Sequence, residues 1–143
     1  MKVKDIMTYN TETIDSGANL VKAAKKMGAL KLGSLAVCKG EDLVGMITDR
    51  DIVIRGIAEG KNPSETKVNT VMTPKVFSCL EDDDIETAAK IMEDKNVHRL
   101  VVLNSNSEQA GIISLSDIAV KGHNEHLTYE IFEHIAEPAC PHR

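Results

Sequence analysis

The sequence has no tryptophan and only two phenylalanines and two tyrosines, so a hydrophobic core must be built from aliphatic side chains. It also lacks the apolar N-terminal run of a signal peptide, because the chain starts Met1-Lys2-Val3-Lys4-Asp5. No stretch approaches the roughly 18 consecutive apolar residues of a membrane-spanning helix. We therefore expect a cytoplasmic protein without a membrane partner.

Cysteine is scarce, and neither sign of charge dominates. The three cysteines, Cys38, Cys79 and Cys140, are an odd number at wide spacing, which is not typical of a secreted disulfide framework. We expect Cys38 and Cys79 to behave as small core hydrophobes. The 17 Lys and Arg against 22 Asp and Glu give a formal charge of -5 without a basic cluster, so we expect no nucleic-acid partner.

Sequence motifs of catalysis are missing as well. The chain has no Gly-rich phosphate loop of the Walker type, no Cys-x-x-Cys pair and no nucleophile elbow. The sequence therefore favours a binding module over an enzyme. Its 143 residues suffice for one domain or for two small units that share a core.

What the sequence does contain is an internal repeat. The run from Val3 to Thr8 reappears from Val68 to Thr73, an offset of 65 residues. The same offset relates two apolar stripes: Leu20, Ala23, Ala24 and Met27 to Ile85, Ala88, Ala89 and Met92. Beyond a polar turn the offset becomes 66 and relates a second set: Gly45, Ile47, Thr48, Asp51 and Ile52 to Gly111, Ile113, Ser114, Asp117 and Ile118. A one-residue insertion in a surface turn is what a structural repeat tolerates.

The repeat predicts an α+β fold of two β-α-β-β-α units packed as a pseudo-two-fold pair. Each stripe has the i, i+3, i+4, i+7 spacing of an amphipathic helix, and two short β-rich runs and a second helix follow it. We place the first repeat at residues 1–60, a linker at 61–67, the second repeat at 68–122 and a C-terminal helix and tail at 123–143.

The predicted tail helix has an apolar stripe, Leu127, Ile131 and Ile135, that needs the protein body or a partner chain as a neighbour. Histidine and cysteine are also frequent in the tail: His123, His126, His134, Cys140 and His142. Their spacing fits no standard closed zinc site. We therefore predict no metal site, and favour a flexible tail or a dimer contact.

Two copies of Val-x-x-hydrophobic-Met-Thr, each followed by a helix, a hairpin and Gly-hydrophobic-Ile-Thr/Ser-x-x-Asp, resemble a tandem pair of cystathionine-β-synthase (CBS) domains, a Bateman module. The resemblance covers residues 1–122. In length and in the run from Gly45 to Ile54, the chain is also similar to stand-alone CBS-pair proteins of the hypoxic response protein class. The resemblance implies clefts for AMP, ADP or ATP as regulatory ligands, a disc-like homodimer, and regulation without turnover.

Carried over by position, the resemblance implies that Asp51 and Asp117 accept hydrogen bonds from ribose hydroxyls, while Thr48 and Ser114 approach the phosphate. A further pair, His98 and Arg99, resembles phosphate contacts in the γ subunit of AMP-activated protein kinase. The first repeat departs from this pattern, because Gly33-Ser34 stands in the place of His98-Arg99. The two sites are therefore not expected to be equal, and Arg50 or Lys31 could supply the missing positive charge.

The residues themselves allow both a functional and a purely structural interpretation. A carboxylate can accept from both hydroxyls of a cis diol, and the free N–H groups at a helix start attract phosphate. Thr48-x-x-Asp51 and Ser114-x-x-Asp117 are, however, also capping boxes, which stabilise helices by roughly 0.5 to 2 kcal/mol. The alternative function is therefore a homodimerisation scaffold whose ligand sites are vestigial.

The candidate cations have structural alternatives too. Neighbours on a strand point to opposite faces, so His98 and Arg99 are not both expected to reach one cleft, and Arg99 is the favoured phosphate contact. A surface ion pair is the alternative for Arg99. For Arg50 the alternative is a pair with an acidic residue of its own helix.

Overall fold

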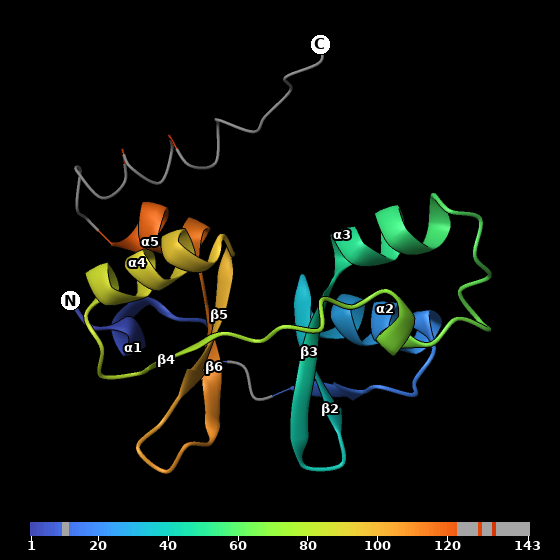
Figure 1. Cartoon of the computed structure of the whole chain (residues 1–143), viewed down its shortest axis with the longest axis horizontal. Helices are drawn as coiled ribbons and strands as arrows, with labels where there is room; N and C mark the ends of the chain where they lie inside the picture. Colours follow the sequence, from blue (N-terminus) through green and yellow to red (C-terminus); the bar gives the residue numbers. More distant parts are fainter. Residues whose placement is uncertain (10–11, 123–128, 130–132, 134–143) are drawn as a thin grey trace. The chain divides into compact units, whose positions relative to one another are not determined.

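The structure is a computed structural model that describes residues 1–9, 12–122, 129 and 133. The chain folds into two compact units (Figure 1). We call residues 12–76 the central unit. The other unit joins the N-terminal residues 1–11 to residues 77–143, and we call it the split unit.

A three-stranded sheet with two flanking helical segments forms most of the central unit. The sheet order is β1-β2-β3, with β1 parallel and β3 antiparallel to β2. In chain order its elements are β1 (Thr13–Asp15), α2 (Leu20–Leu30), β2 (Ser34–Lys39), β3 (Asp42–Thr48), α3 (Asp49–Asp51), η1 (Ile52–Ile57) and η2 (Val68–Thr70).

The split unit repeats this topology in a second sheet of order β4-β5-β6. Its elements are α1 (Val3–Ile6), β4 (Ser78–Leu80), α4 (Ile85–Lys95), β5 (Arg99–Leu103), β6 (Gln109–Ser114) and α5 (Leu115–Lys121). The predicted α+β class and the β-α-β-β-α order of each repeat are therefore confirmed. Most of the predicted C-terminal helix lies outside the described residues.

The long helices α2 and α4 form where the sequence predicts them. Asn19 caps α2, since its Oδ1 accepts a hydrogen bond of 2.8 Å from the backbone N–H of Lys22. Each helix ends at a residue in the left-handed conformation, Lys31 (φ 56°) or Asn96 (φ 53°). The predicted apolar stripes face the two cores except at Ala24, which is exposed. The cores are aliphatic apart from cysteine and methionine, with Phe77 at the edge of one of them.

The two copies exchange their first segments. Residues 68–73, which begin the second copy, pack on the central unit, and residues 3–8, which begin the first copy, pack on the split unit. Residues 68–73 pair with β3, because Met46 and Thr73 exchange two backbone hydrogen bonds of 2.9 Å. Residues 3–8 pair with β6 through two bonds of 2.9 and 3.0 Å between Thr8 and Ile112. We call residues 3–8 and 68–73 the crossing segments. They complete the cores, since Val3 and Val68 are fully buried.

Two matched glycines make this close approach possible. A side chain at Gly45 would meet the carbonyl oxygen of Thr73, and one at Gly111 would meet the carbonyl oxygen of Thr8. The compact units therefore differ from the predicted domains. The predicted domains follow the two sequence copies, whereas each compact unit contains the first segment of the other copy.

The two described cysteines differ in burial. Cys79 on β4 lies in the core, and burial raises the pKa of its thiol to about 12, so the prediction of a core hydrophobe is confirmed. For Cys38 the prediction is wrong, because this residue is only half-buried, just after a register irregularity that follows the buried run of β2. Within residues 1–9 and 12–122, no helix is long and apolar enough to cross a membrane.

Candidate functional site

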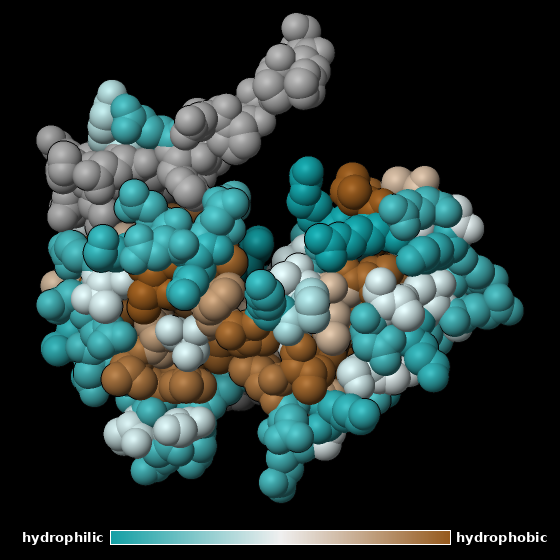
Figure 2. Space-filling model, viewed as in Figure 1, coloured by the Kyte–Doolittle hydropathy of each residue, from teal (hydrophilic) through white to brown (hydrophobic). Residues whose placement is uncertain are grey.

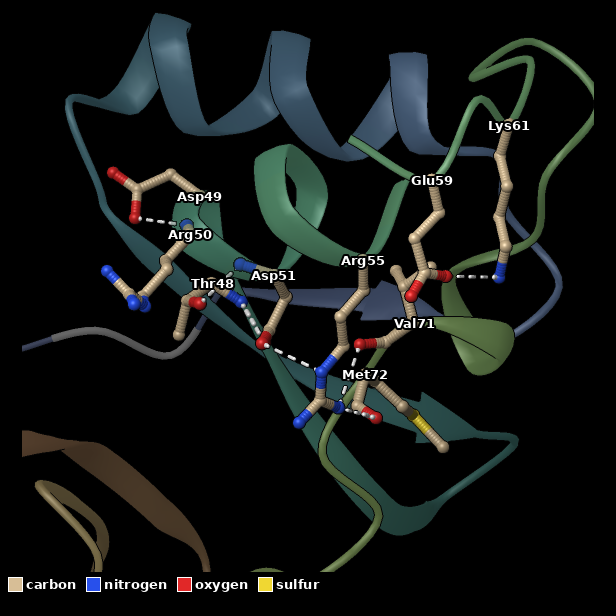
Figure 3. A network of polar contacts seen from close by, with 9 residues as sticks. All are labelled: Thr48, Asp49, Arg50, Asp51, Arg55, Glu59, Lys61, Val71 and Met72. Atoms are coloured by element: carbon tan, nitrogen blue, oxygen red, sulfur yellow. Dashed lines mark hydrogen bonds and ion pairs between the residues drawn. The ribbon is translucent and has the colours of Figure 1, made fainter. Parts of the chain in front are cut away.

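In the central unit, Thr48 and Asp51 form a capping box at the start of α3 (Figure 3). The Oγ1 of Thr48 accepts a hydrogen bond of 3.0 Å from the backbone N–H of Asp51. In return, the Oδ2 of Asp51 accepts one of 3.0 Å from the backbone N–H of Thr48. The side chain of Asp51 is only 13% exposed.

The split unit has the same arrangement at the start of α5. The Oγ of Ser114 accepts a bond of 3.1 Å from the backbone N–H of Asp117, and the Oδ2 of Asp117 accepts one of 3.0 Å from the N–H of Ser114. The side chain of Asp117 is 16% exposed. We call residues 48–51 and 114–117 the two capping sites. Their capping interpretation is confirmed, but it engages only one oxygen of each carboxylate, so further donors can still be accepted.

The other oxygen of each carboxylate faces a cation one helical turn further on. The Nε of Arg55 lies 4.0 Å from Asp51 Oδ1, and the Nζ of Lys121 lies 3.5 Å from Asp117 Oδ1. Sequence reasoning missed both cations. The i, i+4 spacing from acid to base, present in both copies, is the signal that could have identified them.

These cations also contact the crossing segments. The Nη1 of Arg55 donates to the carbonyl oxygens of Val71 and Met72, both at 3.4 Å (Figure 3). The Nζ of Lys121 donates to the carbonyl oxygen of Ile6 at 3.5 Å. Ile6 and Val71 are equivalent positions of the repeat, so the two contacts correspond to one another.

The structure brings Arg99 to the capping site of its own unit. Arg99 pairs with Ser114 across β5 and β6, and Ser34 pairs with Thr48 across β2 and β3. Residues directly opposite on antiparallel strands point to the same face. No described carboxylate lies within ion-pair distance of Arg99. The surface ion pair predicted as the alternative role of Arg99 is therefore not seen among the described residues.

The main-chain carbonyls of His98 and Gly33 accept hydrogen bonds from the first residues of α5 and α3. The carbonyl oxygen of His98 accepts a bond of 3.0 Å from Leu115 N–H, as the carbonyl of Gly33 does from Asp49 N–H. The side chain of His98 is exposed. A ligand role for His98 stays a prediction, as do the ligand roles of the other candidate residues.

Arg50 lies at the surface next to the central capping site. Its backbone N–H donates 2.8 Å to Asp49 Oδ1, and in Figure 3 its side chain extends on the other side of Thr48 from Arg55. The predicted ion pair within its own helix is not seen among the described residues. Lys31 is exposed at the end of α2.

Metal ligands do not gather in the part of the chain that the structure describes: no group of three or more His, Cys, Asp or Glu there could hold an ion. The histidines 123, 126, 134 and 142 of the tail and Cys140 lie outside the described residues.

A family profile described as "CBS domain" matches residues 3–56 and 68–122. The chain belongs to the CBS domain family. Hypoxic response protein 1 of Mycobacterium tuberculosis is 30% identical over 136 residues, which cover 94% of each protein. A crystal structure of Hypoxic Response Protein I with two coordinated zinc ions has a TM-score of 0.68 and covers 85% of this chain and 98% of that one.

Further proteins are similar to this CBS-domain protein. The chain spans 57% of an uncharacterised protein of Methanopyrus kandleri, which is 35% identical over 80% of this chain. A CBS-domain protein of unknown function from Thermoplasma acidophilum, 24% identical, has a TM-score of 0.79 and covers 94% and 76% of the two chains. One from Pyrobaculum aerophilum complexed with AMP, 17% identical, has a TM-score of 0.73 and covers 92% and 98%. At these identities the two structures show the shared fold alone.

Proposed function

We propose that this CBS-domain protein is a non-catalytic regulatory module that binds an adenine nucleotide at its two capping sites. The observation that carries the proposal is the repetition of one arrangement: a hydroxyl and a largely buried carboxylate, joined by the same two hydrogen bonds in both units. Either carboxylate retains acceptor capacity for the hydroxyls of a ribose. The AMP complex of the Pyrobaculum aerophilum protein supports this choice of ligand class.

In this proposal Asp51 and Asp117 bind the ribose, and Thr48 and Ser114 approach the phosphate. Arg99, placed opposite Ser114, adds a planar set of donors suited to phosphate oxygens, with His98 next to it. The central unit has Ser34 at the equivalent position, which leaves Arg50 or Lys31 as its candidate cation for the phosphate. We therefore expect two unequal sites, of which the one in the split unit binds a nucleotide phosphate more tightly.

A thermal-shift panel tests the proposal. A ligand that binds only the native state raises the melting temperature, and at about 100 times its Kd it stabilises by about 2.7 kcal/mol. We expect AMP, ADP or ATP to raise the melting temperature, and NAD and S-adenosylmethionine serve as further adenosyl ligands. If none of these five ligands raises the melting temperature, the nucleotide-binding proposal fails and the homodimerisation scaffold is the favoured function.

We also propose a homodimer, because the helical face of the central unit exposes apolar side chains that a second copy would cover. Val53 and Ile57 are 54% and 52% exposed, and Ile54 and Leu30 are exposed too. Figure 2 shows brown, apolar patches among teal, hydrophilic surface in the region of α3 and η1. Exposed apolar patches at a surface mark contact sites.

A hollow of about 340 Å³ lies in the same face. It is lined by Ala24, Met27, Gly28, Leu32, Asp49, Ile52 and Val53. In the second repeat, Glu93 and the buried Leu115 stand at the positions of Gly28 and Asp49. A partner's apolar side chain could enter this hollow, so we expect the central unit to contribute much of the contact.

Ile54→Glu should therefore convert the dimer to a monomer, because a charge would have to be buried unpaired at the contact. Light scattering after size exclusion measures the mass. Leu80→Glu is the matched control, since Leu80 is similarly exposed on β4 but lies outside this face. The dimer proposal fails if the wild-type protein is monomeric or if Ile54→Glu leaves the dimer intact.

A cytoplasmic location stays a prediction of the sequence.

A further inference from the structure

Each capping site has a second connection, through a cation, to the crossing segment of the same unit. Arg55 lies between Asp51 Oδ1 at 4.0 Å and the carbonyl oxygens of Val71 and Met72, both at 3.4 Å. These carbonyls belong to the crossing segment 68–73, and Figure 3 shows the guanidinium between the carboxylate and that segment.

The split unit repeats the connection with different chemistry. Lys121 lies between Asp117 Oδ1 at 3.5 Å and the carbonyl oxygen of Ile6 at 3.5 Å. A single half-exposed contact of this kind contributes little to stability. However, both units contain the same arrangement of a carboxylate, a cation and a main-chain carbonyl at equivalent positions. Its repetition with two different cations supports a role beyond a chance surface contact.

We infer that Arg55 and Lys121 are positioning residues that couple nucleotide occupancy at each capping site to the seating of the crossing segment on that unit. This inference rests on the proposed function. It adds a regulatory consequence to binding: a ligand at the carboxylate changes how firmly residues 68–73 or 3–8 are held.

The direction of the coupling follows from competition for the cation. Without ligand, the carboxylate and the carbonyls share the N–H donors of Arg55 or Lys121. When ribose hydroxyls donate to the carboxylate, its negative charge is shared among more donors and attracts the cation less. The cation then donates more fully to the carbonyls, so the crossing segment is held more tightly. By linkage, a loosened segment weakens nucleotide binding by the same factor.

Backbone amides of the crossing segments report this effect directly. Val68 N–H donates to Ala18 at 2.8 Å and Thr73 N–H donates to Met46 at 2.9 Å, so both exchange slowly only while the segment is seated. Val3 N–H, bonded to Asp83 at 2.8 Å, and Thr8 N–H, bonded to Ile112 at 2.9 Å, serve the same purpose in the split unit.

The test is hydrogen exchange of the full chain with and without saturating AMP. In the wild-type protein we expect AMP to slow exchange in both crossing segments. Arg55→Met keeps an aliphatic chain but removes the charge, so it should abolish the slowing in residues 68–73 and preserve it in residues 3–8. Lys121→Met should do the reverse. Neither variant should weaken AMP binding through the carboxylate, because each removes the cation that competes with the ribose hydroxyls for it.

Lys90→Met is the control, because Lys90 makes an i, i+4 pair with Asp94 on α4 without contacting a crossing segment. It should change neither pattern. If calorimetry finds a single AMP site, only the segment of the unit that binds should respond. Absence of AMP, ADP and ATP binding to the wild-type protein overturns the proposed function. If AMP binds normally but still slows exchange in both crossing segments of Arg55→Met and Lys121→Met, the coupling is overturned and the proposed function is not.

Discussion

Gly111→Ala should lower the free energy of unfolding by about 2–6 kcal/mol. The added Cβ would lie against the carbonyl oxygen of Thr8, a main-chain atom that cannot move without disturbing the two hydrogen bonds between Thr8 and Ile112. Overpacking typically costs about 1–3 kcal/mol, and each lost hydrogen bond adds about 0.5–1.5 kcal/mol. Chemical denaturation with a linear extrapolation to water measures the difference.

The repeat supplies a second variant, and α2 supplies a control. Gly45→Ala places its Cβ 2.7 Å from the carbonyl oxygen of Thr73 and 2.6 Å from the flexible Met72 sulfur, so its loss should be similar or somewhat smaller. Gly28→Ala meets nothing within 4 Å in the interior of a helix and should stabilise by about 0.5–1 kcal/mol. Wild-type stability of Gly111→Ala would contradict the seating of residues 3–8 on β6.

The repeated β-α-β-β-α units were predictable because their signals are local. Apolar periodicity and turn residues lie within one copy, and the offset of 65 to 66 residues relates the two copies directly in the sequence. The capping boxes could be predicted for the same reason, since Thr48 and Asp51 are three residues apart.

The exchange of the crossing segments could not be predicted from these signals. Residues 3–8 and 68–73 carry the same pattern, and β3 and β6 each offer a glycine at the matching position. Either segment could therefore pair with either strand as far as the sequence shows, and only the chain path between them decides. Missing the exchange also meant missing Arg55 and Lys121, whose carbonyl partners lie in these segments.

Asp117→Ala should remove one nucleotide-binding event and Asp51→Ala the other, each with at least a tenfold loss of affinity at its own site. A hydrogen bond to a charged group contributes about 1.5–3 kcal/mol, which corresponds to a roughly 10- to 150-fold change in Kd. Isothermal titration calorimetry with AMP gives both the affinity and the number of sites. Because Arg99 lies only in the split unit, Asp117→Ala should remove the tighter event.

The control must separate ligand binding from helix capping, since each substitution also breaks a capping box worth about 1 kcal/mol. Asn19→Ala removes a comparable cap from α2, outside both capping sites, and should lower stability while AMP binds with unchanged stoichiometry. Unchanged stoichiometry in both aspartate variants would mean that the carboxylates serve the helices alone. The repeated geometry would then be a folding device, because the oxygens that face Arg55 and Lys121 would have no other ligand than those cations.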